Sequence, residues 1–470
     1  MRSRKRRSVR RKSFGKRAIT VIWHALVSVA LLTAANLLLS AEARAPLSDR
    51  PIVESSPSRP EILDFHMLDL YRGVQLQRMG DGTFALFTTE DGGGEWVRVN
   101  TGPEEDIRRR YERWAAMESA EDMPLPREAW VSQGGPGDSV RKLQFATAKI
   151  GWGLIAGREQ EESRLWFTYD GGRTWQREAT EEFRRTLKEE QRRLEAAAQE
   201  ARYFGDAQAA AEAMSRPVTL IPSRTAPGDV VLVRSSEPGR FEWDGRTYDL
   251  QPFGAGYYTY LPIGMSVKPG LYSILGERLV VEEKSFETQY LVVTEEQASM
   301  RQNTERIQAD QRKIDQARSE SHPAFLFPAD SKFMKPVEGR LTTPYGYTRY
   351  INGVYSGSHT AIDLAAPQGT PVYATNDGVV ALADDLYLTG LTIYIDHGMH
   401  LFSQYAHLSE LKVKTGDRVK KGDVIGLVGS TGFSTGPHLH FTFWAHNIPV
   451  NPNLFFDRTP FDWLASTPDD

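Results

Sequence analysis

The sequence predicts a multidomain protein that is mainly β, with helical linkers and a compact antiparallel β domain near its C-terminal end. The first observation is length, because 470 residues exceed one ordinary hydrophobic core and predict two to four domains. The second is strand-like patterning, which recurs over residues 61–177, 217–293 and 325–457. The third is that the segments between these regions, 178–216 and 294–324, are polar and are expected to be helical.

Composition excludes several kinds of site. The chain has no cysteine, which excludes disulfides, thiolate metal sites and cysteine nucleophiles. Any bound metal ion must therefore be held by histidine and carboxylate side chains. The net charge of -4 indicates no nucleic-acid partner.

An N-terminal basic block, residues 1–17, carries ten Lys or Arg and no acidic residue. It precedes the mostly apolar residues 18–41, which are long enough to span a membrane, and small-residue cleavage sites follow within 41–45. We expect a transmembrane signal anchor or a cleaved signal peptide, and favour the anchor because of its length. Either one places the rest of the chain outside the cytoplasmic membrane, anchored or secreted. Residues 46–60, with four prolines, are expected to be a linker.

The region 61–177 is expected to be β-rich and contains one pattern twice, Thr-x-Asp-x-Gly-x-x-Trp, over 89–96 and 168–175. Asp and Gly suit a turn, and the Trp can pack back beneath it. The pattern resembles the Asp-box hairpin of sialidase-like β-propellers. Two copies are too few for a propeller. We therefore expect a small β scaffold domain without a catalytic role.

The segment 178–216 is expected to be a helical linker with a narrow apolar stripe at Phe183, Leu187 and Leu194, broken near Gly205. It is interpreted as a solvated spacer or as a helix that packs on one neighbour, with a partner-binding coiled coil as the alternative. The region 217–293 alternates short strands with turn signals, which predicts an immunoglobulin-like sandwich. Its expected strands are Val230–Val233, Phe241–Trp243, Thr247–Leu250, Tyr257–Leu261, Leu271–Leu275, Leu279–Val281 and Tyr290–Val293.

The residues that can carry chemistry lie in 325–457. His359 and Asp363 are four positions apart, so in an extended segment both side chains lie on one face. His438 and His440 alternate with apolar residues, which is typical of a strand with one buried face. A third alternating segment presents Tyr405 and His407, with ordinary packing the favoured interpretation of the tyrosine. Two histidines and one carboxylate form the ligand set of a catalytic zinc site, which keeps a fourth position open.

The region 325–457 resembles the lysostaphin/LytM-type zinc metalloendopeptidases, which have the duplicated-hybrid-motif β fold. The resemblance is carried by Ser358–Asp363 and Ser434–His440, although Ala361 stands where the family usually has glycine. Further matching segments are Tyr345–Arg349, Gly369–Ala374, Asp377–Val380, Tyr405–Leu408, Gly416–Val419, Gly422–Gly426, Gly429–Gly432 and Val450–Pro452. Residues 458–470 are left as a C-terminal tail.

The resemblance implies that one Zn²⁺ per chain is bound by His359, Asp363 and His440, and that His407 and His438 are catalytic. We favour His438 as the general base and His407 as the donor to the developing oxyanion, and the two roles can be exchanged. His397, His400 and His446 are interpreted as structural or surface residues, because the ligand set is already complete.

The implied function is that of an extracytoplasmic zinc metalloendopeptidase, a hydrolase that cuts amide bonds in peptidoglycan stem peptides or cross-bridges. Its implied partners are peptidoglycan and, through the N-terminal segment, the cytoplasmic membrane. The first alternative is a non-catalytic cell-wall-binding or activator protein, with the N-terminal β-rich or helical segments recruiting a protein partner. The second is a zinc endopeptidase that acts on a surface protein.

Overall fold

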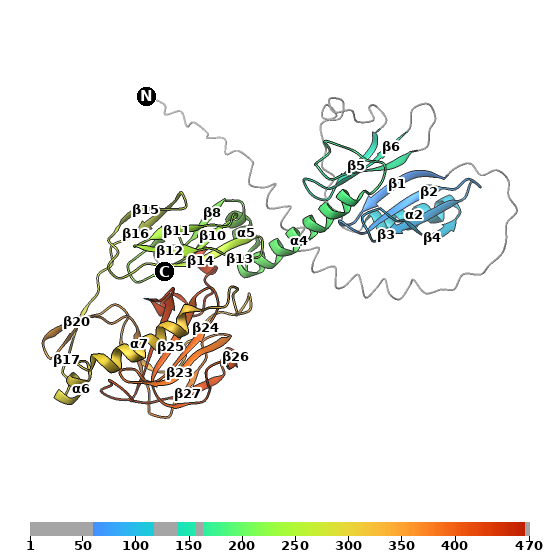
Figure 1. Ribbon diagram of the computed structural model, residues 1–470. Helices are drawn as coiled ribbons and strands as arrows, with labels where there is room; N and C mark the ends of the chain where they lie inside the picture. The colour runs from blue at the N-terminus through green and yellow to red at the C-terminus, as the bar shows by residue number, and fades with distance from the viewer. Residues whose placement is uncertain (1–59, 117–139, 157–162, 466–470) are drawn as a thin grey trace, which may run out of the picture. The chain divides into compact units, whose positions relative to one another are not determined.

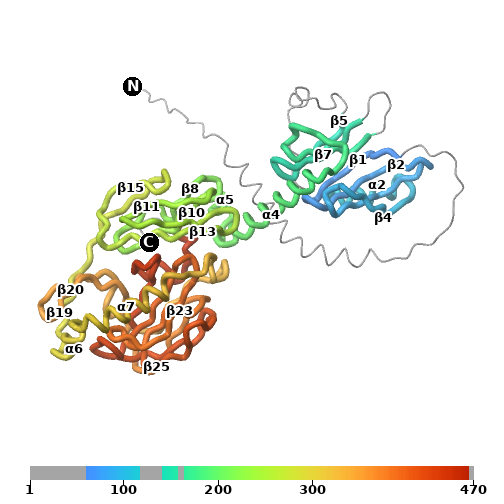
Figure 2. The backbone as a smooth tube through the Cα atoms, in the orientation of Figure 1, coloured from blue at the N-terminus to red at the C-terminus, as the bar shows by residue number. Residues whose placement is uncertain are grey.

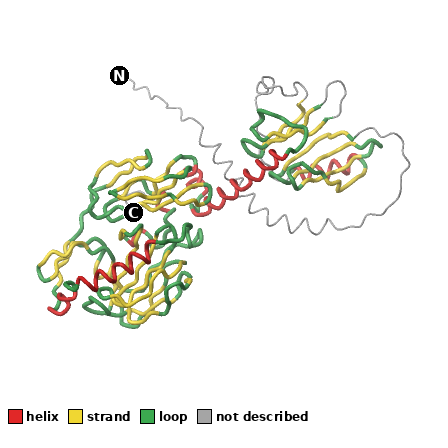
Figure 3. The backbone as a smooth tube through the Cα atoms, viewed as in Figure 1, coloured by secondary structure: helices red, strands yellow, loops and turns green. Residues whose placement is uncertain are grey.

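The computed structural model describes residues 60–116, 140–156 and 163–465 (Figure 1). The predicted basic block, the segment 18–41 and nearly all of the 46–60 linker lie outside these residues. Within the described residues, no helix is both long enough and apolar enough to cross a membrane. Strands are the main regular structure, as predicted (Figure 3). The chain divides into two compact units, with the boundary between Glu195 and Ala196.

The first unit contains two small antiparallel sheets, ordered β1-β2-β3-β4 and β5-β6-β7 (Figure 2). Its elements are β1 (Glu61–Met67), β2 (Gly73–Arg78), β3 (Phe84–Thr89), β4 (Val97–Gly102), α2 (Glu104–Ala115), β5 (Val140–Phe145), β6 (Gly151–Ile155) and β7 (Arg164–Thr168). Trp152 and Phe167 are buried in its core, and Phe183 and Leu187 of helix α4 (Glu181–Tyr203) pack into the same cluster. The stripe predicted for this helix is therefore a packing face.

The two repeated loops of the first unit have the same hydrogen-bond pattern. In each, the Asp carboxylate accepts from the preceding Thr hydroxyl and from a backbone N–H four residues on, and the Trp indole donates to a Gly carbonyl. The residues are Thr89, Asp91, Glu95 and Trp96 after β3, and Thr168, Asp170, Thr174 and Trp175 after β7. The side chains thus hold the turns closed, which is a structural role. Their relation to the Asp box stays a prediction.

Helix α4 ends at Tyr203, and a second helix, α5 (Ala207–Met214), follows after a short break. Gly205 has a φ of 64°, a left-handed conformation that glycine adopts without strain. Asp206 then caps α5, because its carboxylate accepts from the backbone N–H of Ala209 at 2.7 Å. The break therefore falls where Gly and Asp predict it.

The second unit begins with a small β domain of three sheets, ordered β13-β14-β10-β8, β11-β12 and β15-β16-β9. Its strands are β8 (Val218–Ile221), β9 (Arg224–Thr225), β10 (Val230–Ser235), β11 (Arg240–Trp243), β12 (Arg246–Asp249), β13 (Gln251–Phe253), β14 (Gly256–Pro262), β15 (Gly270–Ile274) and β16 (Glu277–Val281). Val231, Val233, Leu261 and Leu279 are buried in its core. An immunoglobulin-like relationship for this domain stays a prediction.

The last strand predicted for the small domain belongs elsewhere. The predicted strand Tyr290–Val293 corresponds to β17 (Thr288–Leu291), which pairs in parallel with β19 (Thr348–Ile351). The prediction that it completes the sandwich is therefore wrong. Alternation along a strand indicates that a strand exists, but it does not identify the strand with which it pairs.

The C-terminal domain is built on a ten-stranded sheet with the central order β18-β21-β28-β25-β24-β23-β26. Its strands are β18 (Arg340–Thr343), β21 (Ile362–Ala365), β22 (Pro371–Tyr373), β23 (Gly378–Leu386), β24 (Gly390–Asp396), β25 (Leu401–Leu411), β26 (Arg418–Val419), β27 (Val424–Val428), β28 (His438–Ala445) and β29 (Ile448–Val450). β17, β19 and β20 (Val354–Ser358) form a separate three-stranded sheet. Two connector helices, α6 (Glu295–Met300) and α7 (Thr304–Ser319), precede this domain, and α7 packs on its sheet through Ile314 (Figure 1).

The segment after residue 457 is part of the packed structure. Phe461 and Trp463 are buried beside the short 3-10 helix Asp462–Ala465. Phe461 lies against Phe325, with ring centroids 5.2 Å apart. The predicted end of the domain at 457 is therefore too early, because these aromatic side chains belong to the core.

Candidate metal centre

Four of the predicted site residues lie on adjacent strands of the ten-stranded sheet, and His359 lies just before one of these strands, β21. In the antiparallel pair β21–β28, Asp363 lies opposite His440. The next strand, β25, places Ala406 opposite His440, so His407 follows directly beside it. Leu439 and Phe441 are completely buried on the other face of β28, which is the alternation expected from the sequence.

His359, Asp363 and His440 converge on one point, and one ligand atom of each lies within 4.8 Å of the others. Asp363 Oδ1 lies 3.2 Å from His359 Nε2 and 2.9 Å from His440 Nδ1. The two histidine nitrogens are 3.3 Å apart. Local backbone pairing therefore brings together three side chains that span 82 sequence positions, counted from 359 to 440.

The tautomers of three histidines follow from their carbonyl partners, because a carbonyl oxygen can only accept. Nδ1 of His359 donates to Pro344 at 3.3 Å. Nδ1 of His407 donates to Thr431, and Nδ1 of His438 donates to Gly436, each at 2.8 Å. In the neutral ring the other nitrogen then carries a free lone pair. All three rings therefore present an unprotonated Nε2.

The electrostatics keep these groups in the states that bind a cation. Burial alone raises the pKa of Asp363, but its contacts with the side chains of His359 and His440 hold that pKa well below its ordinary value. Burial lowers the pKa of His359. Burial, reinforced by the neighbouring histidines, lowers the pKa of His407 to about 3. Near neutral pH the carboxylate is therefore ionised and both imidazoles are neutral.

The two predicted catalytic histidines lie beside the three predicted ligands. The rings of His407 and His438 are 4.9 Å apart, and the ring of His407 is 5.6 Å from that of His440. His438 Nε2 is 3.7 Å from Asp363 Oδ1. The structure thus brings all five predicted residues together.

The three histidines interpreted as structural or surface residues have contacts outside this cluster. His397 is fully buried, donates from Nδ1 to Asp377 and lies 2.8 Å from Ser403 through Nε2. His400 and His446 stack with ring centroids 4.5 Å apart. Tyr405 is likewise completely buried, and its hydroxyl accepts from a backbone N–H, which fits ordinary packing.

The donor set fits a zinc ion. Two imidazole nitrogens and one carboxylate oxygen face one another, and the bare lone pairs of acceptors placed this close repel unless a cation or protons lie between them. This set is typical of catalytic zinc sites, in which a fourth position stays open. His359, Asp363 and His440 are therefore the residues that could hold the metal.

Two polar residues near the cluster had no role in the sequence interpretation. Arg349 Nη2 lies 3.5 Å from Asp363 Oδ2, and its Nε donates to Gln289 Oε1 at 3.1 Å. Arg349 belongs to a segment that carries the resemblance, and a charged residue within a strand is the only signal it gave. Gln289 gave none, because its pairing across 60 residues is a tertiary feature.

The connector helices contact the segments that lead into β21 and β28. Gln297 Nε2 donates to the carbonyl oxygen of Ser434 at 2.9 Å. Arg301 donates to the hydroxyl of Ser356 at 2.5 Å. The region 294–324 therefore does more than join domains, because it contacts the loops that position the site.

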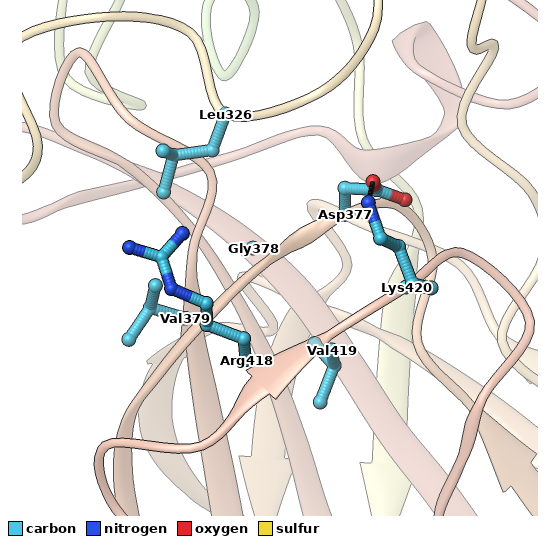
Figure 4. Close-up of a pocket in the computed structure, with 7 residues that line it drawn as sticks. All are labelled: Leu326, Asp377, Gly378, Val379, Arg418, Val419 and Lys420. Atoms are coloured by element: carbon cyan, nitrogen blue, oxygen red, sulfur yellow. Dashed lines mark hydrogen bonds and ion pairs between the residues drawn. The ribbon is translucent and has the colours of Figure 1, made fainter.

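A shallow pocket lies elsewhere on this domain, between the start of β23 and β26 (Figure 4). Its lining residues are Leu326, Asp377, Gly378, Val379, Arg418, Val419 and Lys420. Lys420 is paired with Asp377 at 2.7 Å. None of the five predicted site residues lines this pocket, so it is separate from the metal centre.

Comparison with known proteins identifies the C-terminal domain. The sequence model of peptidase family M23 matches residues 357–452. The DD-carboxypeptidase/endopeptidase Mpg of Neisseria meningitidis is 44% identical over 116 residues, which are 25% of this chain and 27% of that protein. The peptidoglycan DD-endopeptidase ShyC of Vibrio cholerae is 44% identical over 95 residues, 20% of this chain and 22% of that protein.

A solved putative peptidase M23 from Pseudomonas aeruginosa is 30% identical, with a TM-score of 0.38, and the match covers 49% of this chain and 94% of that one. The chain spans between about a fifth and a third of the length of the curated relatives named here and of a Buchnera metalloprotease that it also matches. All five predicted site residues lie inside the matched segment. Residues 357–452 of this chain form a domain of peptidase family M23.

Proposed function

We propose that this protein is an extracytoplasmic zinc metalloendopeptidase that hydrolyses amide bonds in peptidoglycan stem peptides or cross-bridges. The observation that carries the proposal is the convergence of three ligand atoms within 4.8 Å, with two further histidines beside them. A non-catalytic relative would not need all five groups. The amide-bond substrate is supported by two relatives, the DD-carboxypeptidase/endopeptidase Mpg and the peptidoglycan DD-endopeptidase ShyC.

Zinc bound by His359, Asp363 and His440 would act as a Lewis acid and lower the pKa of water to about 7. In the neutral ring of His438, Nε2 carries the free lone pair and lies beside the predicted ligands, so it can accept a proton from the attacking water. The resulting imidazolium can then donate that proton to the leaving amine.

His407 requires a change from the role first expected. Its Nδ1 proton is used on the Thr431 carbonyl, and its pKa of about 3 keeps the ring neutral. Its Nε2 can therefore accept a hydrogen bond but cannot donate one to an oxyanion. We assign His407 to holding the attacking water or a substrate N–H, with His438 as the base.

The location outside the cytoplasmic membrane, with residues 18–41 as an anchor, is proposed from the sequence pattern alone. Fractionation of cells that express the full chain would test it. Recovery with the membrane, with the C-terminal domain open to external protease, is expected. Protection from protease in intact spheroplasts would contradict it.

The function is tested by incubating the zinc-loaded protein with purified peptidoglycan and assaying new amino termini. Wild type should release them, and a chelator should stop the release. The variant His438→Ala should keep about one zinc per chain and lose cleavage. No release by wild type at any zinc loading would overturn the hydrolase proposal. Loss of zinc from His438→Ala would overturn the division between ligands and base.

A further inference from the structure

A closed chain of polar contacts surrounds the predicted ligand Asp363. Its Oδ2 accepts from Arg349 Nη2 at 3.5 Å, and Arg349 Nε donates to Gln289 Oε1 at 3.1 Å. Gln289 Nε2 in turn donates to Thr343 Oγ1 at 3.0 Å. Thr343 lies opposite Asp363 in the β18–β21 pair. The side-chain contacts therefore link Asp363 through Arg349 and Gln289 to Thr343, and Thr343 is paired with Asp363 through the backbone.

The two oxygens of Asp363 have different surroundings. Oδ1 faces the nitrogens of His359 and His440. Oδ2 faces the guanidinium of Arg349. A carboxylate can rotate about its terminal bond, so contacts on both oxygens are needed to hold one oxygen toward a cation. Arg349 supplies the contact on the outer oxygen.

The position of Arg349 depends on a strand outside the matched family segment. Gln289 and Arg349 lie opposite each other in the parallel pair β17–β19. β17 follows the small β domain, 66 positions before the family match begins, counted from 291 to 357. The side chain of Arg349 is only 18% exposed, so its orientation is fixed by these contacts rather than by solvent.

We propose that Arg349 and Gln289 are positioning residues that hold Asp363 with Oδ1 toward the metal, which makes β17 a working part of the metal centre. This inference rests on the proposed function for its metal. Groups that hydrogen-bond to a metal ligand fix its orientation, and their loss typically costs about 10–100-fold in metal affinity or activity. The positive charge of Arg349 also stabilises the ionised form of the Asp363 carboxylate, in addition to orienting it.

The test measures zinc affinity of the full-length protein by competition with a chelator of known affinity. Arg349→Ala should weaken zinc binding by about 10–100-fold. Gln289→Ala, which leaves the arginine in place without its partner, should weaken it by a smaller factor. Arg349→Lys keeps the positive charge and should restore part of the loss. Arg340→Ala removes an exposed arginine of β18 and should leave the affinity unchanged.

A second measurement separates orientation from folding. The visible absorption spectrum of the Co²⁺-loaded protein reports ligand geometry, and it should change in Arg349→Ala while the melting temperature without metal stays near wild type. Affinities and spectra of Arg349→Ala and Gln289→Ala that equal wild type would overturn the proposal. A loss for Arg349→Ala that is matched by lower stability and not improved by lysine would also overturn it. Absence of zinc binding by wild type would instead contradict the proposed function.

Discussion

Two buried polar clusters in the second unit have opposite chemistry. Glu200 on α4 and Arg234 on β10 form an ion pair at 2.6 Å, with side chains that are 0% and 2% exposed. Tyr258 and the backbone N–H of Ala255 donate to the same carboxylate at 2.7 and 2.8 Å. Donors and acceptors are matched, so this cluster needs nothing more.

The cluster of His359, Asp363 and His440 is less deeply buried, with side chains that are 2%, 11% and 22% exposed, and it consists mainly of acceptors. Of the three atoms that face one point, His359 Nε2 and Asp363 Oδ1 can only accept. Burial of charge therefore does not by itself indicate a functional site. A buried cluster indicates a ligand when its own donors cannot satisfy its acceptors.

Of the changes that separate the two clusters, removal of a predicted zinc ligand should have the largest effect, and the effect should be on zinc binding and cleavage. In Asp363→Ala, zinc affinity and cleavage should both fall by more than about 100-fold, beyond the range for residues that only orient ligands. The remaining two histidines cannot replace the charged oxygen. Zinc content by elemental analysis and cleavage of peptidoglycan measure the two effects. Retention of both would show that Asp363 is not a ligand.

Breaking the matched cluster should affect stability and leave the metal centre intact. Glu200→Ala leaves the Arg234 guanidinium buried without its partner, which should cost about 3–5 kcal/mol of unfolding free energy. Urea denaturation measures the cost, and chelator competition on the folded variant should give the wild-type zinc affinity. Equal losses of zinc affinity in Glu200→Ala and Asp363→Ala would remove the distinction between the two clusters.

Removal of zinc should lower the stability of the folded protein only when His359, Asp363 and His440 are all present. With free zinc at 100 times its dissociation constant, binding to the folded state contributes about 2.7 kcal/mol. Wild type should lose that amount on addition of a chelator, seen as a lower melting temperature. The Asp363→Ala variant should show no shift. If the melting temperature of wild type does not change on addition of the chelator, the folded protein does not bind zinc.

Acid should destabilise the fold through His397 by a smaller amount. Burial lowers the pKa of His397 from 6.5 to about 4, so the folded state binds this proton less readily than the unfolded state. Stability is then complete above pH 6.5 and falls by up to about 1.4 kcal/mol per pH unit as the pH decreases toward 4.

Between pH 6.5 and 5 this linkage amounts to about 1.6 kcal/mol, because the unfolded imidazole is only half protonated at pH 6.5. Unfolding free energies of wild type and His397→Asn, measured with chelator present so that zinc does not contribute, should differ in their pH slopes over that range. Parallel slopes would mean that His397 does not carry the linkage. Asn is suitable because it can still donate one hydrogen bond to the Asp377 carbonyl.

Short-range patterns predicted which residues converge in the candidate metal centre. Two patterns depend only on strand geometry and can therefore be recognised in the sequence. They are the alternation around His438 and His440 and the spacing of His359 from Asp363. The break at Gly205 and the strand-rich composition were equally accessible. Each of these features is decided within a few residues of chain.

The features that were missed depend on long-range pairing. Glu200 lies in a charged helix that was interpreted as a solvated spacer or as packing on one neighbour, and only the tertiary structure places Arg234 against it. Gln289 reaches the site because β17 pairs with β19, and no local pattern specifies that partner. The tautomer of His407 depends on the Thr431 carbonyl, 24 residues away. This is why the oxyanion role expected for His407 changed.

The central claim is that the acceptor cluster on β21 and β28 is completed by zinc. The most direct measurement is anomalous scattering at the zinc absorption edge from crystals of the protein grown with zinc. We predict one peak in this cluster, about 2.0–2.2 Å from His359 Nε2, Asp363 Oδ1 and His440 Nδ1. A crystal with no peak at these atoms, or with its zinc held by other side chains, would contradict the account.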